Sequence, residues 1–199
     1  MDTLEKNTRG VLLVLSGPSG TGKGTVCKVV RDELGDAIAY SISATTRKPR
    51  NGEEHGREYF FFTKEEFESL RDQNGFLEWA QVYDNYYGTP RAFVEEVLDS
   101  GRDCILEIDP QGALQVRNAT EEAILVFIAP PSLEELRNRL TGRGTEAPEE
   151  VEKRLSCAEN ELSYSNQYDY IIVNNEVEQA AEKMKAILLA ERCRVNKVR

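Results

Sequence analysis

The stretch GPSGTGKGT, residues 17–25, decides the fold expected for this chain. It follows an apolar run, residues 11–15, and precedes a helix-like segment, residues 26–34, so it lies at a strand-to-helix turn. Glycines there let backbone N–H groups turn toward phosphate oxygens, the helix N-terminus favours anions, and Lys23 can reach the outer phosphates of a nucleoside triphosphate. The stretch therefore predicts a phosphate-binding P-loop.

The loop departs from the usual pattern at one position. The residue after the lysine is normally Ser or Thr, whose hydroxyl binds Mg²⁺. Here that residue is Gly24, and the hydroxyl follows one place later in Thr25. Direct binding of Mg²⁺ by Thr25 is therefore an open question, and we expect nucleotide oxygens, water and nearby carboxylates to hold the ion.

Apolar runs alternate with helical patterns along most of the chain. The runs at 11–15, 104–108, 123–129 and 170–173 precede helical patterns at 26–34, 112–116, 132–140 and 176–193. This alternation is typical of a parallel sheet with helices on both faces, so the predicted fold class is α/β. Candidate helix N-caps are Ser132, Asn175 and, with Glu66 three residues later, Thr63.

Two stretches interrupt this alternation. Residues 41–90 hold many aromatic and turn residues and predict a small β-rich insertion with one helix. Residues 139–165 contain Gly142 and Gly144 ahead of a helix that begins at Pro148, and they predict a helical lid on a glycine hinge. The core of a single domain is then formed by about 9–40, 91–138 and 166–199.

Composition excludes several classes of protein. The chain of 199 residues carries 35 acidic and 25 basic side chains, a net charge of −10, which argues against nucleic acid as a partner. No apolar run is long enough for a membrane span, and the four cysteines form no CxxC pair, so we expect no membrane partner, a cytoplasmic location and reduced thiols. The oligomeric state, monomer or homodimer, stays open.

The predicted insertion carries groups suited to a phosphate monoester. In TTRKPR, residues 45–50, Arg47 and Arg50 can converge on one phosphate through their guanidinium groups, although a solvated basic turn would look the same. Tyr59 and Tyr87 can add hydroxyl donors or can simply belong to the core of the insertion. Together these side chains favour a second anion site.

Three carboxylates are candidates for binding a base or a metal. Glu78 lies in the apolar stretch FLEWA, where a carboxylate needs hydrogen-bond donors. Glu107 and Asp109 end the strand CILEID at the sheet edge where α/β proteins bind ligands, and their spacing of two puts them on one face. They favour contacts to substrate or metal-bound water, with ordinary strand-end charges as the alternative.

These motifs together resemble the guanylate kinases, which transfer phosphate from ATP to GMP. The resemblance covers nearly the whole chain after Gly10 and rests on GPSGTGKGT, SATTRKPRNGE, EYFF, FLEWA, NYYGTP, ILEIDPQG, FIAPPS, LTGRGTE and IVNN. It implies a P-loop NTPase sheet with a GMP-binding insertion and a lid, and Mg²⁺ as cofactor with ATP.

The resemblance also implies the site residues. The ATP site would contain Gly17, Pro18, Ser19, Gly20, Thr21, Gly22, Lys23, Gly24, Thr25, Arg139, Arg143 and Asn174. The GMP site would contain Ser43, Arg47, Arg50, Glu53, Tyr59, Glu78, Tyr87, Thr89 and Glu107. The catalytic residues would be Lys23, Arg47, Arg143 and Arg154, and the metal would depend on Asp109 and Thr25.

Chemistry supports guanine as the base, because a single carboxylate can accept hydrogen bonds from the adjacent N1–H and N2–H₂ donors. Adenine presents an acceptor and a C–H there, so Glu78 would discriminate between the two bases. A kinase for AMP, UMP or dTMP is one alternative. It would have the same phosphate loop and lid, but it would not need a carboxylate at position 78. A non-catalytic protein-binding scaffold is the other alternative, and the intact Lys23, Arg143 and Arg154 disfavour it.

Overall fold

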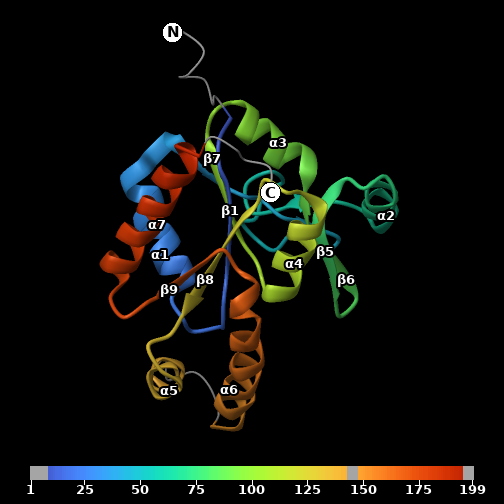
Figure 1. Ribbon diagram of the computed structural model, residues 1–199. Helices are drawn as coiled ribbons and strands as arrows, with labels where there is room; N and C mark the ends of the chain where they lie inside the picture. The colour runs from blue at the N-terminus through green and yellow to red at the C-terminus, as the bar shows by residue number, and fades with distance from the viewer. Residues whose placement is uncertain (1–8, 143–147, 195–199) are drawn as a thin grey trace, which may run out of the picture.

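The structure, a computed structural model, describes residues 9–142 and 148–194. Its centre is a parallel sheet, built in the described residues from five strands in the order β2-β7-β1-β8-β9 (Figure 1). The strands are β1 Leu12–Ser16, β2 Ile38–Tyr40, β7 Asp103–Glu107, β8 Ile124–Ala129 and β9 Tyr170–Val173. The predicted α/β class is therefore confirmed.

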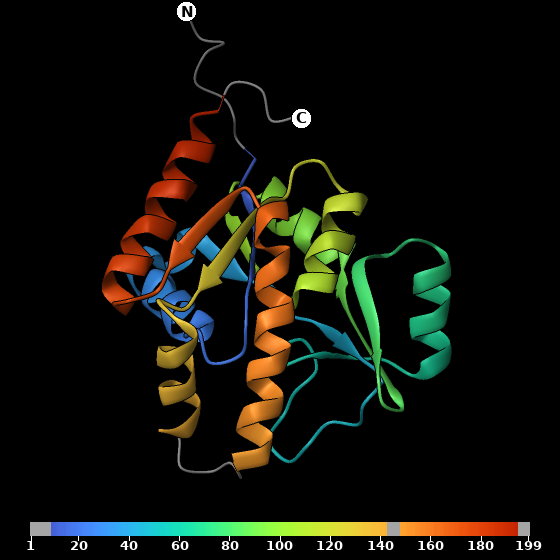
Figure 2. The same ribbon diagram turned by 60° about the horizontal axis from the view of Figure 1, so that its bottom comes forward.

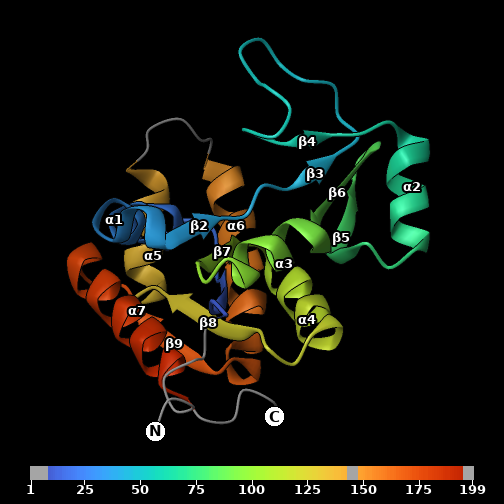
Figure 3. The same ribbon diagram turned by 90° about the horizontal axis from the view of Figure 1, so that it is seen from above.

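Helices cover both faces of this sheet. Helices α1, Lys23–Leu34, and α7, Val177–Arg192, lie on one face, while α3, Arg91–Asp99, and α4, Pro110–Ala119, lie on the other (Figures 1 and 3). Strand β1 serves both layers, because alternate side chains point to opposite faces. Leu13 and Leu15 pack toward α1 and α7, and Leu12 and Val14 pack toward α3 and α4.

A second, smaller sheet lies to the side of the first, with strand order β4-β3-β6-β5. Its strands are β3 Ala44–Thr45, β4 Phe60–Phe61, β5 Phe76–Val82 and β6 Asn85–Pro90. Helix α2, Lys64–Asp72, covers its outer side (Figure 3). Phe67 of α2 stacks on Phe76 with ring centroids 4.3 Å apart, and burial of each ring stabilises this layer by roughly 1.5–3 kcal/mol.

Two helices project beyond the carboxyl edge of the large sheet. They are α5, Leu133–Thr141, and α6, Pro148–Leu162, and they run side by side (Figure 2). Their contact is an apolar cluster of its own, made of Leu136, Leu140, Val151, Leu155 and Ala158. Short 3₁₀ turns follow α1 at Gly35–Ala37 and α6 at Ser163–Gln167.

The helix caps agree with the sequence at two of three positions. Thr63 and Glu66 form a reciprocal capping box, and Ser132 accepts a hydrogen bond from the backbone N–H of Glu135 at 3.1 Å. The expected cap at Asn175 is wrong, because α7 begins one residue later behind Glu176, which makes no side-chain cap bond. The buried face of α7 includes Ala180, Ala181, Met184 and Leu188.

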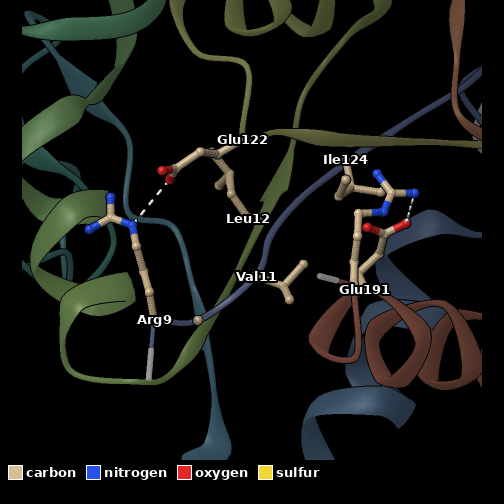
Figure 4. A pocket seen from close by; sticks show the side chains of 8 residues that line it. Arg9, Val11, Leu12, Glu122, Ile124 and Glu191 are labelled. Carbon is tan, nitrogen blue, oxygen red and sulfur yellow. Dashed lines mark hydrogen bonds and ion pairs between the residues drawn. The ribbon is translucent and has the colours of Figure 1, made fainter. Parts of the chain in front are cut away.

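At the amino edge of the large sheet, two buried carboxylates fasten the last turn of α7. Glu191 accepts a 2.6 Å hydrogen bond from the hydroxyl of Tyr170, and Asp103 pairs with Arg192 at 2.9 Å while accepting from the backbone N–H of Val11. Figure 4 shows a small pocket next to Glu191, with Arg9 and Glu122 on one side and Glu191 on the other. Its volume of about 20 Å³ is enough for one water molecule.

Candidate active site

The phosphate loop lies between β1 and α1, at the carboxyl edge of the large sheet. Gly17 has φ +137°, and a Cβ there would lie 2.2 Å from the carbonyl oxygen of Ile128. Gly22 has φ +85°, and a Cβ there would lie 2.6 Å from Nδ2 of Asn174. Only glycine fits both positions, because both the backbone conformation and the space exclude a side chain.

Lys23 is folded back onto the loop in this structure. Its Nζ donates hydrogen bonds to the carbonyl oxygens of Gly17 at 2.6 Å and Pro18 at 3.0 Å. Burial lowers the pKa of Lys23, and the charge of Glu107 partly offsets that effect. The ammonium group is therefore already held inside the loop, where the phosphates of a nucleotide would compete for it.

Asn174, at the end of β9, supports the loop from below. It is 1% exposed, and its Nδ2 donates to the carbonyl oxygen of Thr21 at 2.7 Å. Arg139 of α5 donates to the carbonyl oxygen of Asn174 at 3.1 Å and pairs with Glu135 at 2.9 Å. Of the expected ATP residues, Ser19, Gly24 and Thr25 are exposed, and Thr21 is buried.

The lid residues are only partly described. Arg143 and Gly144 lie outside the described residues, and Gly142 ends α5 with an ordinary helical φ of −64°. Arg154 is partly buried on α6. On the same helix, burial raises the pKa of Glu161, and the charge of Lys23 acts in the opposite direction.

The candidate base-reading pair lies on the smaller sheet, where Glu78 of β5 is opposite Thr89 of β6. The Thr89 hydroxyl donates a 2.6 Å hydrogen bond to Oε1 of Glu78, and both side chains are buried. Burial raises the pKa of Glu78, with a smaller opposing effect from that hydrogen bond. Glu78 and Ser43 both line a cavity of about 170 Å³.

The candidate phosphate-monoester site is organised around Arg47. Its Nη1 and Nη2 each bind one oxygen of Glu53 at 3.0 Å, and Glu53 also accepts from the backbone N–H of Arg50 at 2.7 Å. The guanidinium carbon lies 5.4 Å from the ring centre of Tyr59, which in turn meets Tyr87 edge-on at 6.2 Å. Glu53 therefore orients Arg47 and Arg50, and its negative charge makes it a poor direct ligand for phosphate.

Glu107 connects the two halves of the site. Its carboxylate lies beside Gly24 of the phosphate loop, and Glu107 also lines a cavity of about 420 Å³ together with Ser43, Tyr59 and Thr89. The hydroxyl of Tyr40, on β2, donates a hydrogen bond to Oε2 of Glu107. Nothing in the sequence marks Tyr40, because a strand of three residues is too short to show a period.

The expectation that Asp109 ends the strand together with Glu107 is wrong, because β7 ends at Glu107 and Asp109 lies two residues later, at the start of α4. It is exposed and caps α4 by accepting a 2.7 Å hydrogen bond from the backbone N–H of Gly112. Its charge acts on Glu78 and contributes to the raised pKa of that residue. Among the described residues no group of three or more His, Cys, Asp and Glu could by itself hold a metal.

Comparisons with known proteins agree on one family. The family described as Guanylate kinase matches residues 9–191. The guanylate kinase of Caldanaerobacter subterraneus subsp. tengcongensis is 52% identical over 189 residues, 95% of this chain and 91% of the relative. That of Clostridium perfringens strain SM101 is 51% identical over 100% of this chain and 92% of the relative.

Solved structures lead to the same result. The crystal structure of guanylate kinase from Anaplasma phagocytophilum matches with a TM-score of 0.69 and 37% identity, over 95% of this chain and 89% of that one. The SH3-kinase fragment of tight junction protein 3, at 12% identity and TM-score 0.51, covers 94% of this chain and 58% of that one, and shares the fold alone. No helix in the described ranges is long and apolar enough to cross a bilayer. The chain belongs to the guanylate kinase family.

Proposed function

We propose that the protein transfers the γ-phosphoryl group of ATP reversibly to GMP, giving ADP and GDP, and that dGMP is a second acceptor. The observation that carries this proposal is the position of Glu107. Its carboxylate lies beside the phosphate loop at Gly24 and also lines the cavity shared by Ser43, Tyr59 and Thr89. A triphosphate on the loop and a monophosphate in that cavity would therefore be neighbours.

Glu78 is proposed to select guanine. Thr89 occupies Oε1 of Glu78, which leaves the rest of the carboxylate free to accept hydrogen bonds from N1–H and N2–H₂ of the base. Ser43 and Glu107 would complete the contacts to the base from the adjoining wall. AMP would face the same buried carboxylate with an acceptor, and its rejection would follow from that unpaired charge.

Charge neutralisation is proposed to carry the chemical step. The nucleophile is a phosphate oxygen of GMP that is already ionised, so no general base is needed. Arg47, with Arg50, Tyr59 and Tyr87 around the GMP phosphate, would hold that oxygen in line. Lys23 and the two lid arginines, Arg143 and Arg154, would stabilise the charge on the transferring group.

On the ATP side we propose that the phosphate loop holds the phosphates and that Arg139 and Asn174 border the adenine. The structure supports a positioning role for these last two, because Asn174 is buried against Thr21 and Arg139 binds the backbone of Asn174. The side chain of Asn174 would therefore support the loop, and Arg139 would hold the backbone of Asn174 in place.

Mg²⁺ is the proposed cofactor, bound mainly by the phosphates of ATP. The donor set fits such a partly filled shell, because Glu107 and Asp109 offer carboxylate oxygens at the same edge and Thr25 offers an exposed hydroxyl. When bound, the ion would neutralise charge on the phosphates. We also propose that the protein works in the cytoplasm, which suits the free thiols of Cys27 and Cys104, and that it is a monomer or a homodimer.

A coupled assay of ADP release tests the proposal. We expect fast turnover with GMP, slower turnover with dGMP, and at least about 10⁴-fold lower kcat/KM with AMP, UMP, CMP and dTMP. Preference for another monophosphate would make the protein a different nucleotide kinase. Binding of GMP without any turnover would support a scaffold instead.

A further inference from the structure

The phosphate loop lacks a hydroxyl where P-loops usually carry one, and the structure shows what occupies that space. If Gly24 had a Cβ, it would lie 3.6 Å from Oε2 and 3.8 Å from Oε1 of Glu107. Both distances are those of ordinary contact, and Gly24 has no left-handed φ, so a serine side chain would fit there and meet the carboxylate. Glu107 therefore lies where the missing hydroxyl would be directed.

Glu107 does not take this position unaided. It ends β7, whose neighbour at the outer edge of the sheet is β2. Tyr40 of β2 pairs in register with Ile105, two residues before Glu107, so both side chains lie on the face covered by α1. The phenol reaches along this face, and its hydroxyl donates a hydrogen bond to Oε2 of Glu107.

The hydrogen bond restrains the carboxylate of Glu107. Tyr40 is partly buried against the α1 side of the core, and its hydroxyl donates to Oε2 of Glu107. The same carboxylate lies beside Gly24 of the phosphate loop. The bond to Tyr40 therefore fixes one oxygen of Glu107 and leaves the other for the loop.

We infer that Tyr40 is a positioning residue that holds the Glu107 carboxylate over Gly24, so that Glu107 gives the cation of the bound nucleotide the oxygen contact that the loop hydroxyl gives in other P-loops. This inference rests on the proposed use of ATP with Mg²⁺. It assigns to Tyr40 a purpose beyond stabilising an edge strand, and it predicts that the effect of its hydroxyl depends on the metal.

The first experiment measures ATP binding by calorimetry without GMP, once with Mg²⁺ and once with EDTA. In the wild type we expect Mg²⁺ to tighten binding, and in Tyr40→Phe we expect this gain to shrink by about tenfold while binding in EDTA is unchanged. Glu107→Gln should lose at least as much of the gain. In both variants we also expect a weaker electron paramagnetic resonance signal from protein-bound Mn²⁺–ATP than in the wild type. This second measurement does not depend on turnover.

A matched control removes another tyrosine hydroxyl from a glutamate. Tyr170→Phe breaks the 2.6 Å hydrogen bond to Glu191 at the opposite edge of the sheet, so it should leave the Mg²⁺-dependent gain as in the wild type. An equal loss in Mg²⁺ and EDTA for Tyr40→Phe, or no loss, would overturn the inference. If the inference about Tyr40 fails but the wild type phosphorylates GMP, the proposed function still stands. If the wild type neither binds ATP nor phosphorylates GMP, the proposed function and the inference about Tyr40 are both wrong.

The second experiment tests the substitution for the loop hydroxyl. Gly24→Ser restores that hydroxyl, and Tyr40→Phe should then cost much less of the Mg²⁺-dependent gain than it does in the wild-type background. This difference is the coupling in a double-mutant cycle. If Tyr40→Phe costs the same with glycine and with serine at position 24, Glu107 does not stand in for the hydroxyl and the inference is wrong.

Discussion

Thr89 donates its hydroxyl to Oε1 of Glu78 at 2.6 Å across the β5–β6 pair, with both side chains buried. This bond orients the carboxylate before any base arrives.

We predict that Glu78→Gln loses most GMP activity in both kcat and KM and gains little AMP activity, because each charge-assisted bond contributes about 1.5–3 kcal/mol. Its preference for GMP over IMP should narrow, since IMP lacks the N2 donors. Values of kcat/KM for GMP, IMP and AMP measure this, and an unchanged GMP/IMP ratio would mean that another residue reads the amino group.

The same carboxylate should make the empty protein less stable as the pH rises. Burial raises the pKa of Glu78 in the folded state above its unfolded value of about 4.5. The stability that this group contributes is therefore fully present below the unfolded pKa and is lost as the pH rises through the folded pKa. Each unit of raised pKa corresponds to about 1.4 kcal/mol. We therefore expect Glu78→Gln to melt a few degrees above the wild type at pH 8, and the difference to shrink toward pH 5. The exposed Glu121→Gln is the control, and a gain independent of pH would contradict this origin.

Glu53 should act on GMP through Arg47. Glu53→Gln keeps the shape but weakens the hold on the guanidinium group, so we expect the KM for GMP to rise about tenfold with a small change in kcat and none in the KM for ATP. Glu58→Gln breaks a comparable ion pair with Arg57 on the same loop and is the matched control. A lower KM for GMP in Glu53→Gln would mean that Glu53 competes with the phosphate for Arg47.

Lys23 should be needed for turnover more than for folding. We expect Lys23→Ala to lower kcat by about 10²–10³, the usual effect of removing one group that stabilises transition-state charge. The melting temperature should change little, because the hydrogen bonds that Lys23 makes here, to Gly17 and Pro18, lie within the loop itself. Lys28→Ala, on the exposed face of the same helix, should keep wild-type turnover. Near-normal turnover in a folded Lys23→Ala would refute the assigned role.

Helix α6 should respond to occupation of both nucleotide sites. Its inner face packs on α5 through the cluster that includes Leu136 and Val151, and Arg154 lies partly buried on the same helix. We expect hydrogen exchange over residues 148–162 to slow most with a bisubstrate analogue and less with ATP or GMP alone. Equal protection in the empty protein would contradict a closing lid.

Much of the site could be predicted because local sequence is sufficient for it. Glycines of the loop are required by the positive φ angles of the loop itself, and the Thr63 cap needs only Glu66 three residues away. What escaped prediction depends on distant residues. Tyr40 meets Glu107 only because β2 pairs with β7, and the helix at Arg91–Asp99 follows β6 without a turn signal. The pairing of Glu53 with Arg47 likewise depends on how the loop folds, and the expected contact of Glu53 with GMP stays a prediction.

The buried carboxylates at the amino edge have a consequence for engineering. Asp103 and Glu191 fasten the end of α7 at the edge opposite the phosphate loop, through Arg192 and Tyr170. Substitutions that strengthen or weaken this fastening change the melting temperature without touching any group proposed to meet a nucleotide. Substitutions selected for heat resistance can therefore be made at the amino edge of the sheet, and substitutions selected for altered base preference at the nucleotide site on the carboxyl edge. Because the two regions are far apart, their effects on stability should add.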